Sequence, residues 1–331
     1  MSIDSQPLVS VVTPVYNGAK YLAECIESIL AQTYINWEYV IVNNCSTDRS
    51  LEIAQTYAKK EPRIRIQNNQ EFVGKEANEN IAFRQISPES KYCKMVHADD
   101  WLFPECIRQM VELAEAHPSV GLVGAYGLND TRISWDGLPY PSTVVSGREI
   151  CRQTLLRRLY VFGTPTSTLI RSDLIRKRKA LYNEAHIHGD KEGCFDLLQD
   201  SDFGFVHQVL TYTRRHNEAA TSFSEQFNTY LFGNLIILLK YGPIYLNDAE
   251  YNSCLKEHIK DYYAFLAESI IYRRERQFLD YHKNSLRDIG YPFSWAKLSE
   301  ALLLEVIDIL FNPKKSLERV ARKIMKVARG R

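Results

Sequence analysis

The sequence lacks several features that would place it in large classes of protein. No apolar run approaches the roughly 20 residues that a membrane-spanning helix needs, and the polar start, Met1 to Gln6, has no signal-peptide pattern. The seven cysteines are scattered, odd in number and without CxxC spacing, which predicts reduced thiols and no zinc or disulfide framework. These absences lead us to expect a cytoplasmic protein.

Two further absences concern ligands. No GxGxxG motif follows the first apolar run, which disfavours a dehydrogenase. Thr13 to Ala19 also lacks the glycine-rich, basic loop that would favour a sugar-phosphate nucleotidyltransferase, which we keep as an alternative. Basic and aromatic residues are not interleaved as in nucleic-acid-binding proteins, so we expect no nucleic acid partner.

Charge is distributed unevenly along the chain. The net charge is +1, but the last 20 residues hold eight bases and one acid, a charge of +7 that leaves −6 for the rest. Apolar residues in this tail recur at helical spacing, as in an interfacial amphipathic helix. We therefore predict a basic amphipathic helix over 313–331, which either binds the inner face of an anionic membrane or docks on the body.

Apolar runs alternate with helical patterns along the first 128 residues. Strands are predicted at Leu8 to Val12, Tyr39 to Val42, Ile64 to Gln67, Tyr92 to Val96 and Val120 to Gly124. Helices are predicted at 21–30, 50–59, 76–85 and 104–117. This order predicts a mostly parallel α/β sheet that is covered by helices on both faces.

The pattern changes after residue 128. We expect a loop-rich stretch at Asp130 to Val145, a helix near Arg148 to Arg158, an acidic stretch at His186 to Asp202 and a strand at Val206 to Thr213. Beyond Ser224 the chain is predicted to be helical and rich in tyrosine.

Polar clusters follow three of the predicted strands, after Val12, Val42 and Val96. Because ligands of parallel sheets bind at the carboxyl ends of the strands, we expect the three clusters to line one crevice. The last cluster contains the adjacent carboxylates Asp99 and Asp100. Two adjacent carboxylates repel each other unless a cation or hydrogen-bond donors offset the repulsion. This pair is therefore a candidate metal site.

The segments Ser10 to Asn17, Val42 to Asp48 and His97 to Asp100 resemble, in order and spacing, the nucleotide-binding half of family 2 glycosyltransferases with the GT-A fold. The resemblance covers about residues 7–222. It implies an inverting, metal-dependent enzyme that uses Mn²⁺ or Mg²⁺ and moves a sugar from a nucleotide diphosphate sugar to a hydroxyl acceptor. A UDP-sugar is the first choice of donor. The acceptor would be a surface polysaccharide or a lipid-linked glycan.

The resemblance also implies a division of the chain. Residues 1–224 would form the GT-A domain, with a nucleotide-binding half at 7–128 and an acceptor half at 129–224, and 225–331 would be a helical C-terminal region.

The resemblance assigns residues to the donor. Thr13, Pro14 and Tyr16 would line the base and ribose pocket, where a tyrosine ring can stack on a pyrimidine. Asn43 stands where the family usually has an aspartate that reads the uracil imide, and it keeps a carbonyl acceptor without the charge. Gly74 begins a helix start that matches the family's, although Glu79 occupies a position where arginine is frequent.

The metal site is carried over in the same way. Asp100 would bind the cation, Asp99 would approach the ribose or the metal shell, and His216 would complete that shell. His97 stands where the family often has another acid. We expect it to be a hydrogen-bonding wall residue, with a ligand role as the alternative.

The catalytic base is expected in the acidic stretch. Asp190 is the first choice for removing the acceptor proton, Glu192 the alternative and Asp196 the third. Thr164 to Thr168 resembles the segment that forms the acceptor-side floor. The departures at Asn43, Glu79 and His97 keep a second function open, namely a catalytically silent nucleotide-sugar-binding or membrane-associated assembly partner.

Overall fold

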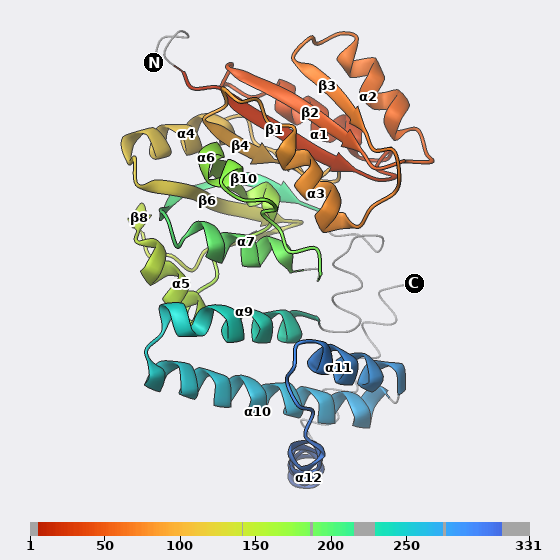
Figure 1. The fold of residues 1–331 in the computed structure, drawn as a ribbon, viewed down its shortest axis with the longest axis vertical. Coiled ribbons are helices and arrows are strands. Elements are labelled where there is room, and N and C mark those ends of the chain that lie inside the picture. The colour runs from red at the N-terminus through yellow and green to blue at the C-terminus, as the bar shows by residue number, and fades with distance from the viewer. Residues whose placement is uncertain (1–5, 141, 186–187, 215–228, 274–275, 313–331) are drawn as a thin grey trace. The chain divides into compact units, whose positions relative to one another are not determined.

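The structure is a computed structural model, and it describes residues 6–140, 142–185, 188–214, 229–273 and 276–312. The chain divides into two compact units, Met1–Thr221 and Ser222–Arg331 (Figure 1). Each unit has its own hydrophobic core.

A ten-stranded sheet forms the centre of the first unit. Its main path runs in the order β3-β2-β1-β4-β9-β6-β10-β5, with β7 paired to β6 and β8 paired to β10. The strands are β1 (Val9–Val15), β2 (Trp37–Asn43), β3 (Ile64–Asn68), β4 (Tyr92–Met95), β5 (Trp101–Leu102), β6 (Val120–Asn129), β7 (Arg132–Ser134), β8 (Val144–Val145), β9 (Thr168–Arg171) and β10 (Asp202–Thr213). The expectation of a mixed α/β fold with a mostly parallel sheet is confirmed. The stretch expected to be rich in loops, Asp130 to Val145, also contains the two short strands β7 and β8.

The described helices of the first unit are α1 (Leu22–Leu30), α2 (Ser50–Ala58), α3 (Lys75–Arg84), α4 (Cys106–Ala116), α5 (Gly147–Leu155), α6 (Ser172–Arg176) and α7 (Gly189–Leu197), with a 3₁₀ turn η2 at Pro165–Ser167. Helices α1 to α5 lie where helices were predicted, whereas α6 and α7 were not predicted. Val9, Val11 and Val15 alternate along β1 and share a core with α1 and α4. Because these positions lie on one face of the strand, α1 and α4 cover that face.

The directions of the strands decide which loops meet. β3, β2, β1 and β4 are parallel, and β9 runs antiparallel between β4 and β6. β10 is parallel to β6 and therefore has the same direction as β4. The carboxyl ends of β1, β2, β4 and β10 consequently lie at one edge of the sheet, together with the beginning of β9.

The second unit is helical in its described part. It consists of α9 (Thr229–Tyr245), α10 (Asp248–Arg273), α11 (Arg276–Asp288) and α12 (Trp295–Phe311). Tyr262, Leu266 and Ala267 of α10 are buried at the centre of its core. Within the described ranges, no helix combines the length and the apolar character that a membrane span requires.

Candidate active site

The loops that follow β1 and β2 are joined by hydrogen bonds. Asn17 has a left-handed backbone (φ 50°), and its Oδ1 accepts a hydrogen bond from the N–H of Thr47 at 2.8 Å. The N–H of Ala19 donates to Oδ2 of Asp48 at 2.9 Å. Asparagine tolerates this backbone conformation because its short side chain can bond locally. These hydrogen bonds therefore join the two loops into one rim beside Tyr16.

An exposed pair of aromatic rings lies on this rim. Tyr16 is 50% exposed and Phe72 is 60% exposed, and their ring centroids are 4.8 Å apart with an interplanar angle of 59°. Sequence reasoning found Tyr16 and missed Phe72, because an aromatic residue in a polar loop gives no periodic signal. Large exposed rings are suited to stacking on a flat ligand.

Thr13 and Pro14 differ in what they offer a ligand. The Thr13 side chain is fully buried, and its hydroxyl oxygen accepts a hydrogen bond from the Tyr39 hydroxyl at 2.9 Å. Pro14 is partly exposed and lies opposite Val42 in the sheet. A contact between Thr13 and a nucleotide would therefore use the backbone and not the hydroxyl.

Two asparagines at the end of β2 organise the neighbouring loops. Nδ2 of Asn43 donates to Oδ1 of Asn68 at 3.2 Å, and its Oδ1 accepts from the N–H of Ser46 at 3.3 Å. The Asn44 side chain makes two hydrogen bonds to the backbone of Val73. Its Oδ1 accepts from the Val73 N–H at 3.0 Å, and its Nδ2 donates to the Val73 carbonyl at 2.8 Å. Asn44 is thus a structural residue that holds the loop before α3.

Gly74 is the N-cap of α3 and is exposed. Its backbone is extended, and no atom of the described residues lies within 4 Å of the position that a Cβ would take. Packing therefore does not require glycine here, and the space beside this helix start is open.

A cluster of possible cation ligands follows β4. One ligand atom from each of His97, Asp99 and Asp100 lies within 4.8 Å of the other two. Asp100 is buried, and its Oδ2 accepts a hydrogen bond from the Thr166 hydroxyl at 2.7 Å. Its Oδ1 accepts from the backbone N–H of Arg214 at 3.0 Å. The ends of β4 and β10 and the segment that precedes β9 therefore meet at this carboxylate.

The electrostatics of the cluster fit a bound cation. Burial, and then the negative charge of Asp99, raise the pKa of Asp100 from 3.8 to about 6. A divalent cation beside the two carboxylates would offset both the repulsion and the loss of hydration. Carboxylate oxygens are the ligands that Mn²⁺ and Mg²⁺ prefer, and Mn²⁺ also accepts an imidazole nitrogen. The donor set thus fits a divalent cation.

A buried lysine fixes the backbone of the segment that bonds to Asp100. Nζ of Lys94, which lies within β4, donates to the carbonyl oxygens of Thr166 at 2.6 Å and Thr168 at 3.0 Å. The side chain is fully buried, and burial lowers the pKa of Lys94. A buried ammonium is costly unless hydrogen bonds satisfy it, so these two bonds hold the start of β9 against β4.

Glu79 of α3 connects two basic side chains. Its Oε1 lies 2.7 Å from Nε2 of His97 and 2.8 Å from Nζ of Lys75. Burial lowers the pKa of His97, but the hydrogen bond and the charge of Glu79 outweigh it, so the pKa of His97 is raised. Burial likewise raises the pKa of Glu79, and Lys75 with His97 more than offsets that rise, so the pKa of Glu79 is lowered. The departures from the family pattern at positions 79 and 97 therefore contact each other.

Asp190 and Glu192 both belong to the first turn of α7 but differ in accessibility. Asp190 is partly exposed, and its Oδ1 accepts from the N–H of Lys191 at 2.7 Å. Glu192 is buried, and its Oε2 accepts from Nδ2 of Asn183 at 3.1 Å. Burial lowers the pKa of Lys75, but the charges of Glu79 and then Asp190 outweigh that effect, so the pKa of Lys75 at the start of α3 is raised.

Arg214 is a structural clamp at the end of β10. Its guanidinium forms an ion pair with Glu24 at 2.5 Å and donates from Nε to the Asp99 carbonyl at 3.2 Å. It also lies over the ring of Tyr21 at 4.4 Å. The predicted metal-shell residue His216 lies outside the described residues.

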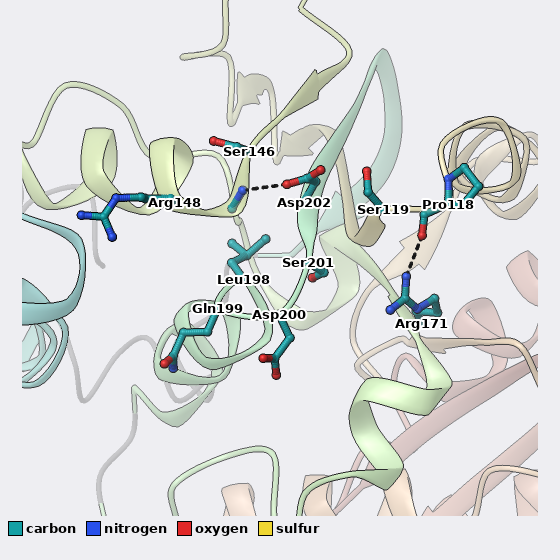
Figure 2. Close-up of a pocket in the computed structure, with 11 residues that line it drawn as sticks. Pro118, Ser119, Ser146, Arg148, Arg171, Leu198, Gln199, Asp200, Ser201 and Asp202 are labelled. Carbon is teal, nitrogen blue, oxygen red and sulfur yellow. Dashed lines mark hydrogen bonds between the residues drawn. The ribbon is translucent and has the colours of Figure 1, made fainter.

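A separate cavity of about 460 Å³ lies where β6 and β10 begin (Figure 2). There the Asp202 carboxylate accepts from the Gly147 N–H at 3.2 Å, and Arg171 donates to the Pro118 carbonyl at 2.9 Å. Because β6 runs in the same direction as β4, this cavity is at the opposite edge of the sheet from Asp100. It contains none of the residues predicted to act in catalysis.

Curated relatives match a large part of this chain. EpsE of Bacillus subtilis, described as a putative glycosyltransferase, is 31% identical over 170 residues, which cover 49% of this chain and 60% of that protein. An uncharacterized glycosyltransferase of Haemophilus influenzae is 34% identical over 256 residues, which cover 72% of this chain and 78% of that protein. The chain thus spans less than two thirds of EpsE and more than two thirds of the second relative.

A solved structure has the same fold. TarS of S. aureus, crystallised as residues 1–349 in complex with UDP-GlcNAc, aligns with a TM-score of 0.63 and 19% identity over 85% of this chain and 80% of that one. The family model described as "Glycosyl transferase family 2" matches residues 10–179, which is about half of the sequence. The chain belongs to the family 2 glycosyltransferases and has their GT-A fold.

Proposed function

We propose that this glycosyltransferase transfers one sugar from a UDP-sugar to a hydroxyl acceptor with inversion at the anomeric carbon. The observation that carries the proposal is the meeting of His97, Asp99 and Asp100 at the carboxyl edge of the sheet. TarS, which has the same fold, binds UDP-GlcNAc. Both observations support our assignment of the nucleotide and the cation of this chain to the same edge.

The donor is assigned to the open rim. Tyr16 and Phe72 offer ring faces to the uracil, and the amide of Asn43 offers a carbonyl to its imide. The diphosphate would lie near Gly74, where the first N–H groups of α3 favour an anion. Asp99 would accept hydrogen bonds from the ribose or share the cation.

Asp100 is assigned to the cation, with Asp99 and His97 beside it and His216 as a further ligand by family resemblance. A bound Mn²⁺ or Mg²⁺ would neutralise charge on the departing diphosphate. The residues of this chain supply a fixed carboxylate, because Thr166 and Arg214 hold both oxygens of Asp100. Such preorganisation spares the site from reordering during the reaction.

Asp190 is proposed as the general base. The acceptor oxygen attacks the anomeric carbon as the bond from that carbon to the diphosphate oxygen breaks, and the hydroxyl proton passes to the Asp190 carboxylate. Asp190 is favoured over Glu192 because Glu192 is buried and bonded to Asn183.

The acceptor is proposed to be a lipid-linked glycan or a growing surface polysaccharide at the cytoplasmic face of the membrane. α12 exposes a row of large apolar side chains, among them Leu310 at 70% and Phe311 at 79%. The basic stretch 313–331 follows directly, although it lies outside the described residues. Exposed apolar area next to positive charge is typical of peripheral attachment to anionic membranes.

Sedimentation with lipid vesicles tests this attachment. The full chain should sediment with vesicles that contain phosphatidylglycerol and not with pure phosphatidylcholine. The double substitution Leu310→Ser with Phe311→Ser should abolish sedimentation, whereas Ile133→Ser, at an exposed apolar position of the first unit, should not. Equal sedimentation of all three proteins would contradict a role for α12.

Donor binding is tested with a panel of nucleotide sugars. One UDP-sugar should raise the thermal unfolding midpoint, and Mn²⁺ should increase that rise, since a ligand that binds only the folded state stabilises it. Release of UDP should accompany binding. Stabilisation without any UDP release, with and without candidate acceptors, would favour the silent binding partner.

A further inference from the structure

We propose that His97 is a nitrogen ligand of the cation, that Glu79 positions its ring, and that the site therefore prefers divalent cations that accept nitrogen. This inference rests on the cation in the proposed function. It changes the expected role of His97 from a wall residue to a ligand, and it makes Glu79 a positioning residue.

The contact between Glu79 and His97 has the chemistry of a supported metal ligand. A histidine that binds a metal usually donates its other ring N–H to a carboxylate, which fixes the orientation of the ring. Here Nε2 lies 2.7 Å from Oε1 of Glu79, so Nδ1 is the ring nitrogen left for a cation. A cation that binds there would displace any proton from Nδ1, while the Nε2–H remains bonded to Glu79.

Glu79 is held firmly enough to act in this way. The side chain is buried, it belongs to α3, and Lys75 lies 2.8 Å from the same oxygen. Its other oxygen, Oε2, is buried and has no hydrogen-bond partner among the described residues. A buried carboxylate with one unsatisfied oxygen is costly, and the contacts with His97 and Lys75 offset part of that cost. Among the described residues, His97 and Lys75 are the partners that the Glu79 carboxylate has.

The His97 ring belongs to the same cluster of possible cation ligands as the two aspartates. His97 offers one ligand atom within 4.8 Å of those of Asp99 and Asp100, and its backbone N–H donates to the Thr166 hydroxyl at 3.1 Å. The same hydroxyl holds Asp100. The backbone of the histidine and the carboxylate of the aspartate are therefore fixed by one side chain.

A nitrogen donor has a consequence for selectivity. Mg²⁺ prefers oxygen ligands and gives up its water reluctantly, whereas imidazole suits later transition metals such as Co²⁺ and Ni²⁺. We expect His97→Asp, which restores an oxygen donor, to lower the affinity for Co²⁺ relative to Mg²⁺ by about tenfold or more. Glu79→Gln keeps the shape of the side chain and should weaken Co²⁺ binding about ten- to a hundredfold.

The experiment is calorimetric titration of the full chain, without a histidine tag, with Mg²⁺, Mn²⁺ and Co²⁺ alone. His117→Asp, at an exposed histidine after α4, is the matched control and should leave the ratio of affinities unchanged. Because His216 is a second candidate nitrogen ligand, pulsed electron spin resonance is done on the Mn²⁺-loaded His216→Ala protein. It should show coupling to a ¹⁴N nucleus, and that coupling should be lost when His97→Asp is added. Thermal unfolding of each variant checks that it is folded.

Two results would overturn the inference. The first leaves the cation of the proposed function intact, and the second does not. If wild type and His97→Asp bind the three cations with the same ratios, and no ¹⁴N coupling appears in the His216→Ala protein, the cation site stands and His97 is a wall residue. If no cation binds to the wild type at all, the cation in the proposed function fails as well.

Discussion

The carboxylate of Asp100 accepts a hydrogen bond from the hydroxyl of Thr166 at 2.7 Å, across 66 residues of sequence. The buried Lys94 holds the carbonyl of the same threonine at 2.6 Å. A residue at the end of one strand is thus fixed by a residue just before the next strand in the sheet. Because β9 is antiparallel to β4, Thr166 reaches the carboxyl edge, where the chemistry is proposed to take place.

Thr166→Val should damage the cation site. It leaves Oδ2 of Asp100 without its hydroxyl donor, and an unsatisfied buried group costs about 1–3 kcal/mol. We expect lower stability in urea unfolding and weaker Mn²⁺ binding in calorimetry. Thr166→Ser keeps the hydroxyl and is the control. Equal Mn²⁺ affinity in the valine and serine variants would show that the hydroxyl does not hold Asp100 in a productive position.

The charge state of Asp100 predicts a dependence of stability on pH. Because its pKa is raised from 3.8 to about 6, the folded protein without a cation is penalised for the charged form, and the penalty is full above pH 6 and shrinks as the pH falls towards 3.8. Asp100→Asn should therefore stabilise the cation-free protein by about 2 kcal/mol at pH 8 and by less at pH 5. Urea unfolding at both pH values measures this.

Saturating Mn²⁺ should reverse the order of stability, so that the wild type becomes more stable than Asp100→Asn. Saturating Mn²⁺ should stabilise the wild type and have little effect on Asp100→Asn. If Asp100→Asn stabilises the cation-free protein equally at pH 5 and pH 8, Asp100 is not the group whose pKa is raised.

The two acidic residues of α7 should behave differently on substitution. Asp190→Asn should keep donor affinity and reduce transfer about 10²–10⁴-fold, because the proton would have no acceptor. Glu192→Gln should cost stability through its contact with Asn183 and leave the transfer rate within a few fold. Single-turnover transfer and donor titration separate the two effects. If Glu192→Gln loses transfer and Asp190→Asn does not, the base is Glu192.

The exposed aromatic pair should contribute to donor affinity. Removal of a ring that stacks on a base costs about 1–3 kcal/mol, so Tyr16→Ala and Phe72→Ala should each weaken UDP binding about fivefold or more. Tyr140→Ala removes another highly exposed ring in the first unit and is the control. UDP affinity by calorimetry provides the comparison. Unchanged affinity in both variants would place the base elsewhere on the rim.

The sequence was sufficient to predict the parallel part of the fold. Apolar runs and helical periodicity marked β1, β2, β4 and the helices between them, and the rule that ligands bind at the carboxyl ends brought the clusters near Tyr16, Asn43 and Asp100 to one edge. The strand ends were less well predicted. β1 extends to Val15 and β10 begins at Asp202, because pairing with neighbouring strands continues beyond the apolar runs.

Other parts of the site depend on contacts that no local pattern encodes. Lys94 lies in a strand that reads as apolar, and only the antiparallel insertion of β9 supplies the carbonyls that satisfy it. Phe72 is in a loop, and its place beside Tyr16 follows from the hold of Asn44 on Val73. The link between Glu79 and His97 joins two positions that looked like independent departures from the family.

The most direct test of the proposed activity is the release of UDP from a UDP-sugar in the presence of Mn²⁺ without an acceptor. A glycosyltransferase slowly passes the sugar to water, so the wild type should release UDP from at least one donor of a panel. Asp100→Ala should release none above background, because the cluster loses its fixed carboxylate. UDP release at the same rate by wild type and Asp100→Ala, or by neither protein with any donor, would contradict the account.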